Sequence, residues 1–255
     1  MGCTCSKRDL GEIEVSSFSP FELSLGLKTS HCKHIDRIFH RFSTFNYMSQ
    51  PQFERACSTL KVDLSTCRGF FYDFVKDEKY CVKKLSTLGV LLGSGSVYEK
   101  AEILFENYDD DISNTLDVNE IHIMIKDLVS IAAEYIPKFV YKINELNEDL
   151  KLLVNKLKFV GNYVAKQYLD DIMDDKLEIS KEFFISKLEK KYAGLLRTEE
   201  IRKKCIFIYK HNLKPIKHVI NAFDSSMVTK NKVLQRHCTL REESSIRICQ
   251  KRNSL

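Results

Sequence analysis

Oxygen-bearing residues recur at every second position of a twelve-residue stretch, Asp109–Glu120. A loop that winds around an ion turns alternate residues inward, and Ca²⁺ takes about six to eight oxygen ligands, with a bidentate Glu at the last position of such a loop. Glu120 stands at that last position, and Thr115 at the seventh would contribute its backbone carbonyl. The spacing therefore predicts one bound Ca²⁺. The predicted ligands are Asp109, Asp111, Ser113, Thr115, Asp117 and Glu120.

The same stretch has the residues that such a loop needs between its ligands. Leu116, at the eighth position, is an aliphatic residue whose backbone would pair with a second loop. The sixth position requires a positive φ and holds Asn114, the residue type that adopts this conformation best after glycine. The agreement of all six ligand types favours a calcium loop over the competing interpretation, an acidic helix N-terminus in a solvated turn.

Two amphipathic helices are predicted on either side of the loop. Apolar residues recur at three- and four-residue steps both before and after it, which is the period of one helical face. The loop is therefore expected between two helices that pack by their apolar sides. These apolar residues are Ala101, Leu104, Phe105 and Tyr108 before the loop, and Ile121, Met124, Ile125, Leu128 and Ala132 after it.

Two segments upstream lie at the distances expected for partner loops, and both have lost ligands. Within Asp73–Lys84, Asp77 occupies a ligand position, but Lys84 holds the twelfth, where a cation would face the ion. Within Ser43–Glu54, aromatic residues and Pro51 stand where oxygen ligands belong. We expect neither segment to bind Ca²⁺.

A third segment, downstream, resembles a remnant of the same kind of loop. Acidic residues cluster at Asp170–Asp175, followed by Ile179 and Glu182, but no single register aligns all of them with ligand positions. Whether this segment binds Ca²⁺ is left open, and one calcium site is expected in the chain.

The first six residues, Met1–Ser6, fit the sequence signal for N-myristoylation, in which Gly2 is acylated after Met1 is removed. One myristoyl chain binds membranes only marginally, so a second attachment is needed. Cys3 and Cys5 are the expected palmitoylation sites, and the basic pair that follows adds attraction to an anionic leaflet. Unless this is a chance match, the protein is expected to be lipid-anchored at the cytoplasmic face of a membrane.

This arrangement resembles the neuronal calcium sensor and calcineurin B group of the EF-hand superfamily. The resemblance rests on Met1–Ser6 and Asp109–Glu120 and extends over roughly residues 1–195. It implies an acylated glycine, four EF-hands in two pairs, and a hydrophobic groove that receives a helix of a target protein. By position, Gly2 would be the acylated residue and the six residues named above the calcium ligands.

A long helix is predicted between the intact loop and the remnant. Apolar residues alternate steps of four and three from Phe139 to Val164, a pattern that permits a coiled-coil seam or a core helix packed within the protein. Leu152, Val154 and Phe159 widen the apolar face and favour the core helix. A helix of this length also allows an inserted interaction surface.

We therefore expect an all-α fold of two EF-hand pairs with an inserted long helix and a C-terminal helical extension. The extension contains a short basic helix with Ile201, Cys205 and Ile208 on one face, which would either lie in the protein's own groove or cap the fold. The expected segments are an acylated terminus (1–20), a degenerate EF-hand pair (21–96), a pair with the intact loop and the long helix (97–195), the helical extension (196–224) and a basic, disordered tail (225–255).

Other classes of protein find little support in the chain. Its apolar runs are too short for a transmembrane helix, and the N-terminus lacks the apolar core of a signal peptide. The nine cysteines include no CxxC pair, which argues against a zinc site or a disulfide framework. Gly93-Ser94-Gly95 lacks the lysine of a phosphate loop, and the tail has basic residues without interleaved aromatics. We expect neither enzymatic activity nor nucleic-acid binding; the oligomeric state is left open.

Two functions are compatible with these features. The first is a membrane-anchored calcium sensor or adaptor in signalling, which binds a target helix through a hydrophobic groove when Ca²⁺ orders the loop. The second is a constitutive structural or regulatory subunit with an EF-hand fold and little calcium switching. Calcium-dependent target affinity would distinguish them.

Overall fold

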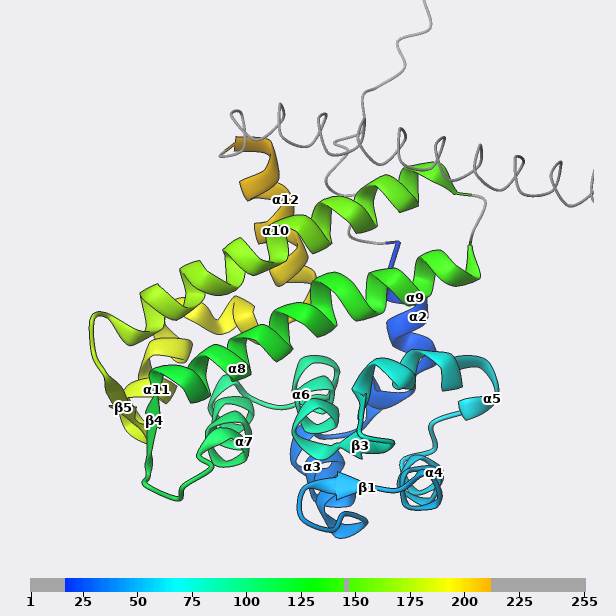
Figure 1. Ribbon diagram of the computed structural model, residues 1–255, viewed down its shortest axis with the longest axis horizontal. Coiled ribbons are helices and arrows are strands. Elements are labelled where there is room, and N and C mark those ends of the chain that lie inside the picture. The colour runs from blue at the N-terminus through cyan, green and yellow to red at the C-terminus, as the bar shows by residue number, and fades with distance from the viewer. Residues whose placement is uncertain (1–16, 145–146, 212–255) are drawn as a thin grey trace, which may run out of the picture. The chain divides into compact units, whose positions relative to one another are not determined.

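Helices make up most of the protein in the computed structural model, which describes residues 17–144 and 147–211 (Figure 1). The predicted all-α class is thereby confirmed. The helices are α2 (Ser19–Ser24), α3 (Cys32–Arg41), α4 (Gln50–Thr59), α5 (Leu64–Cys67), α6 (Val82–Leu92), α7 (Val97–Tyr108), α8 (Val118–Ser130), α9 (Ile136–Ile143), α10 (Glu148–Met173), α11 (Lys181–Lys187) and α12 (Thr198–His211). Single 3-10 turns span Leu27–Thr29, Arg68–Phe74 and Ala193–Leu196, and π-helical turns span Ile131–Tyr135 and Leu188–Tyr192.

Five short strands form two small antiparallel sheets. In the first, β1 (Tyr47–Met48) and β2 (Val75–Lys76) lie on either side of β3 (Lys79–Cys81), and Met48 is opposite Tyr80. In the second, β4 (Thr115–Asp117) pairs with β5 (Glu178–Ser180), and Leu116 is opposite Ile179. The prediction that Leu116 pairs with another segment is therefore confirmed.

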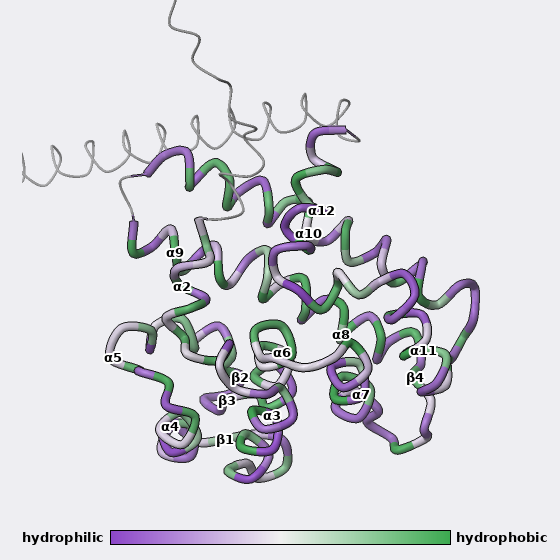
Figure 2. Tube along the Cα trace, turned by 180° about the vertical axis from the view of Figure 1, so that it is seen from behind, coloured by the Kyte–Doolittle hydropathy of each residue, from purple (hydrophilic) through white to green (hydrophobic). Residues whose placement is uncertain are grey.

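The helices on either side of Asp109–Glu120 form as predicted. α7 ends at Tyr108 and α8 begins at Val118. All nine apolar residues predicted to line these helices are buried, because they face α6, α10 and α11 in the core. α6 itself is buried on nearly every side and is mostly hydrophobic in Figure 2. The two segments that bracket the loop are thus held by the interior of the protein.

The predicted long helix is interrupted, so that part of the prediction was wrong. α9 ends at Ile143, and α10 begins after Asn147, whose side chain accepts a hydrogen bond from the backbone of Leu150 as a helix cap. α10 then runs back alongside α8 (Figure 1). The apolar residues from Leu150 to Val164 that were assigned to a seam are buried, as expected for a core helix. Leu152 and Phe159, which were expected to widen its apolar face, are exposed instead, so that part of the prediction was wrong.

α12 carries a buried charge that connects distant parts of the chain. Nη2 of Arg202 lies 2.8 Å from Oε1 of Glu22 on α2, and Nη1 donates to the carbonyl of Ala132 at 3.2 Å. Neither Ile136 nor Pro137 donates to that carbonyl, because Ile136 donates to Ile131 in the π-helical turn and Pro137 has no N–H. Arg202 therefore ties α2 and α12 to the junction of α8 and α9.

Several predictions concern segments outside the described residues. These are the lipidation sites Gly2, Cys3 and Cys5 and the basic tail 225–255. Within the described ranges, no helix combines the length and hydrophobicity needed to cross a membrane.

Candidate calcium site

Three carboxylates meet where α7 ends and α8 begins. Oxygen atoms of Asp109, Asp111 and Glu120 all lie within 4.8 Å of one another. Asp109 is the cap residue directly after α7, and Glu120 is the third residue of α8, so packing of these helices against the core fixes both ends of the group. All the charged donors are oxygens, the ligand type that Ca²⁺ and Mg²⁺ prefer.

Glu120 reaches back across the loop with both of its carboxylate oxygens. Oε2 accepts from the backbone of Asp117 at 3.0 Å, and the Asp117 carboxylate accepts from the backbone of Glu120, which is an ordinary capping box. Oε1 accepts from the backbone of Asp110 at 2.9 Å, ten residues earlier in the chain. The cap accounts for the first contact only; the second closes the loop on itself.

Backbone N–H groups hold the aspartates in place. The backbone of Ser113 donates to Oδ1 of both Asp109 and Asp111, at 2.9 and 3.0 Å, and the backbone of Asn114 donates to Oδ2 of Asp109 at 3.0 Å. Hydrogen bonds from the hydroxyl and backbone of Ser113 lower the pKa of Asp111. These hydrogen bonds favour the ionised form of Asp111 and fix the positions of both aspartates in the loop.

The six predicted ligands differ in how near they lie to the three carboxylates. The Ser113 hydroxyl lies 3.1 Å from the Thr115 carbonyl and 3.5 Å from Oδ1 of Asp109, so these two residues adjoin the carboxylates. Asp117 is not in the group within 4.8 Å, because its carboxylate caps α8. The structure thus brings three of the predicted ligands together, places the Ser113 hydroxyl beside Asp109 and the Thr115 carbonyl beside Ser113, and leaves Asp117 outside the group.

The loop contains two residues in the left-handed conformation. Asn114 has a φ of 59°, as predicted for the sixth position. Ile112 also has a φ of 59°, which is costly for a β-branched side chain, and it is 82% exposed, so little packing offsets the cost. The loop is therefore strained at a residue that sequence reasoning did not single out.

Replacing Ile112 with Asn should relieve this strain. We expect the free energy of unfolding to rise by about 1 kcal/mol, because Asn adopts the left-handed conformation far more readily. Urea denaturation measures the change. Leu177→Asn is the matched control, since Leu177 is 83% exposed but does not have a positive φ. Equal effects of the two substitutions would mean that polarity and not strain is responsible.

Contacts from other elements connect the loop to the core. Asp110 forms an ion pair with Lys83 on α6. The hydroxyl of Tyr108, the last residue of α7, donates to Asp127 of α8 at 2.8 Å, and Lys84 of α6 lies 3.7 Å from the same carboxylate. Burial raises the pKa of Asp127, and the attraction of Lys84 opposes this. The loop and the end of α7 are thus linked by polar contacts to α6 and α8.

The two upstream segments differ in shape from the wide loop at Asp109–Glu120. Each contains a tight turn of two residues with positive φ, Phe45–Asn46 and Asp77–Glu78, in place of a wide loop. Lys84 does not face the turn; it lies 3.5 Å from the Tyr135 hydroxyl and pairs with Asp127. The expectation about Lys84 was therefore wrong.

Each of the other strand–helix units has a residue at the position that Glu120 occupies in its own unit. Glu120 is the third residue of the helix that follows β4. The corresponding residues after β1, β3 and β5 are Gln52, Lys84 and Phe183. Glu54 does not end the first loop, as the sequence had suggested, but lies inside α4. None of the three replacements supplies a carboxylate, and Phe183 disfavours Ca²⁺ at the downstream remnant.

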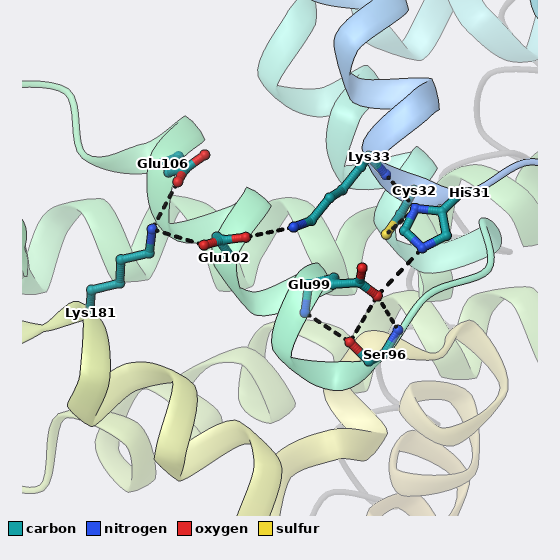
Figure 3. Close-up of polar contacts among 8 residues, drawn as sticks. All are labelled: His31, Cys32, Lys33, Ser96, Glu99, Glu102, Glu106 and Lys181. Carbon is teal, nitrogen blue, oxygen red and sulfur yellow. Dashed lines mark hydrogen bonds and ion pairs between the residues drawn. The ribbon is translucent and has the colours of Figure 1, made fainter.

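A second polar cluster, which sequence reasoning missed, joins α3, α7 and α11 (Figure 3). Lys33 pairs with Glu102 at 2.9 Å, and Lys181 lies between Glu102 and Glu106, at 3.3 and 2.8 Å. Lys181 directly follows β5, so these ion pairs hold the partner strand of the loop against α7. The residues come from three segments that are distant in sequence, so no local sequence pattern predicts the cluster.

Beside this cluster, Cys32 and His31 approach Glu99 (Figure 3). The Cys32 sulfur lies 4.0 Å from Nδ1 of His31, and Nε2 of His31 lies 3.4 Å from Glu99. A thiol beside an imidazole that contacts a carboxylate is the arrangement that activates a cysteine as a nucleophile. However, Cys32 is 1% exposed and burial raises the pKa of its thiol, both of which disfavour a nucleophile.

Comparison with models of protein families and with curated proteins gave no match for this chain. Functional inference therefore depends on the geometry of Asp109–Glu120 and its surroundings.

Proposed function

We propose that the protein binds one Ca²⁺ at Asp109–Glu120 and acts as a non-enzymatic, calcium-responsive adaptor. The observation that carries this proposal is the group of Asp109, Asp111 and Glu120, with oxygens within 4.8 Å, between the ends of two helices. Three carboxylates so close repel one another, and a divalent cation would remove that repulsion. The backbone donors around Asp109 offset only part of it.

We further infer that the helices form four EF-hand units in two pairs. Four helices each follow a short strand, and the strands pair as β1 with β3 and β4 with β5. In the proposed arrangement, Leu116 and Ile179 are the central residues of the second pair, as Met48 and Tyr80 are of the first. Only the loop with Glu120 retains its ligands.

Calcium would act on the rest of the protein through α8. Binding would pull Glu120 toward Asp109 and Asp111, and α8 would follow because Glu120 lies in its first turn. α8 packs against α6 and α10, so its movement would alter the apolar surface between them. We propose that this change exposes a groove for the helix of a target protein.

The second candidate function, a constitutive structural or regulatory subunit, is favoured by one observation. α12 is fixed by the fully buried ion pair between Arg202 and Glu22, and Ile201, Cys205 and Ile208 of α12 are buried. A fold held together in this way resists opening. In this alternative, Ca²⁺ would stabilise the loop without exposing a groove.

An apolar fluorescent dye separates the two functions. We expect its fluorescence to rise when Ca²⁺ is added to the full chain, because the opened groove binds the dye. Glu189→Gln, a substitution of an exposed acid outside the loop, is the control and should behave as wild type. A calcium-dependent gain in thermal stability without a change in dye fluorescence would refute the adaptor and support the constitutive subunit.

We also propose attachment to the cytoplasmic face of a membrane through acyl groups on Gly2, Cys3 and Cys5. The support is the sequence Met1–Ser6, which fits N-myristoylation and has two adjacent cysteines for palmitoylation. Membrane attachment would hold the calcium loop close to the membrane surface, where the target helix would also have to lie.

A further inference from the structure

The face formed by α8 and α10 has a groove with a floor of small side chains. The groove has a volume of about 430 Å³ and lies between the two helices. Its floor is built by Val129 from α8, Ala133 from the π-helical turn that follows α8, and Gly161 and Ala165 from α10. Val129, Ala133 and Gly161 are themselves buried, so they close the bottom of the groove, and Ser130, Asn155 and Asn162 complete its lining.

Exposed apolar side chains stand beside this groove on α10. Leu152, Phe159 and Tyr163 are 51%, 46% and 47% exposed. They are separated by seven and four residues, and these spacings place them on one helical face. Ile123 of α8 is 52% exposed and lies one turn before Lys126 of the groove. Hydrophobic and hydrophilic residues alternate along α10 in Figure 2, as on a helix with two different faces.

Lysines surround these apolar residues. Lys126 and Lys158 line the groove, and Lys166 directly follows Ala165, its last α10 residue. The only acid in the groove lining is Glu134, which pairs with Lys158 at 2.7 Å. In the described part of the chain, no carboxylate lies within ion-pair distance of Lys126 or Lys166. The middle of α10, from Leu150 to Leu169, has four lysines and no acid, whereas the acids of this helix, Glu148, Asp149, Asp170 and Asp171, lie at its two ends. The face therefore has an excess of positive charge.

We propose that this face of α8 and α10 is a membrane-contact surface for anionic phospholipid. Lys126, Lys158 and Lys166 bind the headgroups, while Leu152, Phe159 and Tyr163 enter the boundary between headgroups and acyl chains. Helices that lie in the membrane interface typically combine lysines, which have long flexible side chains, with aromatic residues. The small-residue groove gives room for the upper part of one acyl chain.

The composition of the face favours a lipid surface over a protein partner. Lysine is depleted at protein–protein interfaces, and charged residues are rare at the centre of such interfaces. Here the lysines are interleaved with the apolar residues along the same helix. The positive charge complements an anionic leaflet, to which each nearby lysine adds attraction.

Binding to lipid vesicles tests the proposal. The inference rests on the proposed membrane attachment, so the experiment uses the full chain with Gly2→Ala, in which no N-myristoyl group can form. Cosedimentation is measured with vesicles of phosphatidylcholine alone and with 30% phosphatidylserine, a composition chosen to give roughly the charge of a cytoplasmic leaflet. We expect binding to the anionic vesicles only, and weaker binding at high salt.

Two triple variants locate the surface. Lys126→Gln, Lys158→Gln and Lys166→Gln together should reduce partitioning on the order of 100-fold. The matched control, with Lys76, Lys79 and Lys190 changed to Gln, removes the same charge from other exposed positions and should bind almost as wild type. Thermal unfolding of both variants confirms that they are folded.

Three results would overturn the proposal: no binding of the Gly2→Ala chain to anionic vesicles, equal binding to neutral vesicles, or equal losses in the two triple variants. A failure of lipidation gives a different result. In that case Gly2→Ala would leave the membrane fraction of cells unchanged, whereas the vesicle experiment would still respond to the α8 and α10 lysines.

Discussion

Glu120→Gln is expected to weaken calcium binding by more than about 100-fold. Glu120 is the predicted bidentate ligand, and the amide that replaces it is neutral and coordinates with one oxygen. Loss of an outer hydrogen-bond partner already costs about 10- to 100-fold in metal affinity, so loss of a direct ligand should cost more. Calorimetric titration with Ca²⁺ gives the affinity directly.

The same substitution should remove the stabilisation by Ca²⁺. At a concentration of 100 times the dissociation constant, a bound ion stabilises a protein by about 2.7 kcal/mol. Wild type should therefore unfold at a higher temperature with Ca²⁺ than with chelator, and the variant should not. Glu182→Gln is the matched control, because Glu182 lies in the first turn of α11 but not at the position equivalent to Glu120. Loss of binding in that control would place a site at the downstream remnant instead.

Arg202→Ala is expected to lower the free energy of unfolding by about 3–5 kcal/mol. Arg202 is 0% exposed, and Glu22, its partner, is 2% exposed. The substitution would leave the Glu22 carboxylate buried without its counterion and the Ala132 carbonyl without a donor. It would also remove the guanidinium from the ring of Phe18, which lies 4.9 Å away. Equilibrium unfolding in urea measures the effect.

A double variant distinguishes the ion pair from simple packing. Arg202→Met with Glu22→Leu replaces both charges by apolar side chains of similar volume, and should recover most of the lost stability, because no charge is then left unpaired in the core. If the double variant is as unstable as Arg202→Ala, the shape of Arg202 and not its charge is what the fold requires.

The acidic cluster at Asp109–Glu120 and the two helices beside it could be predicted because their signals are local. A spacing of two positions for oxygen donors, a tolerant residue at Asn114 and an aliphatic residue at Leu116 all lie within twelve residues. The apolar stripes of α7 and α8 are equally local, with a period that only a helix has. The pattern could not show that the Asp117 carboxylate caps α8 and lies outside the group formed by Asp109, Asp111 and Glu120.

Features that depend on contacts between distant residues were missed or misjudged. The break after Ile143 lies in an apolar repeat that continues through it, and only the cap at Asn147 marks it. Lys84 was expected at an ion because the loop was assumed to keep its length; in a two-residue turn, its side chain reaches α8 instead. The partners of Arg202 and Lys181 lie far away in sequence, where no periodicity connects them.

The most direct test of the proposed function is the number of calcium ions bound by the full chain. Calorimetric titration of wild type should give one Ca²⁺ per chain, and Glu120→Gln should give none in the same concentration range. No heat of binding in wild type, two or more ions per chain, or normal binding by Glu120→Gln would each contradict a single site at Asp109–Glu120.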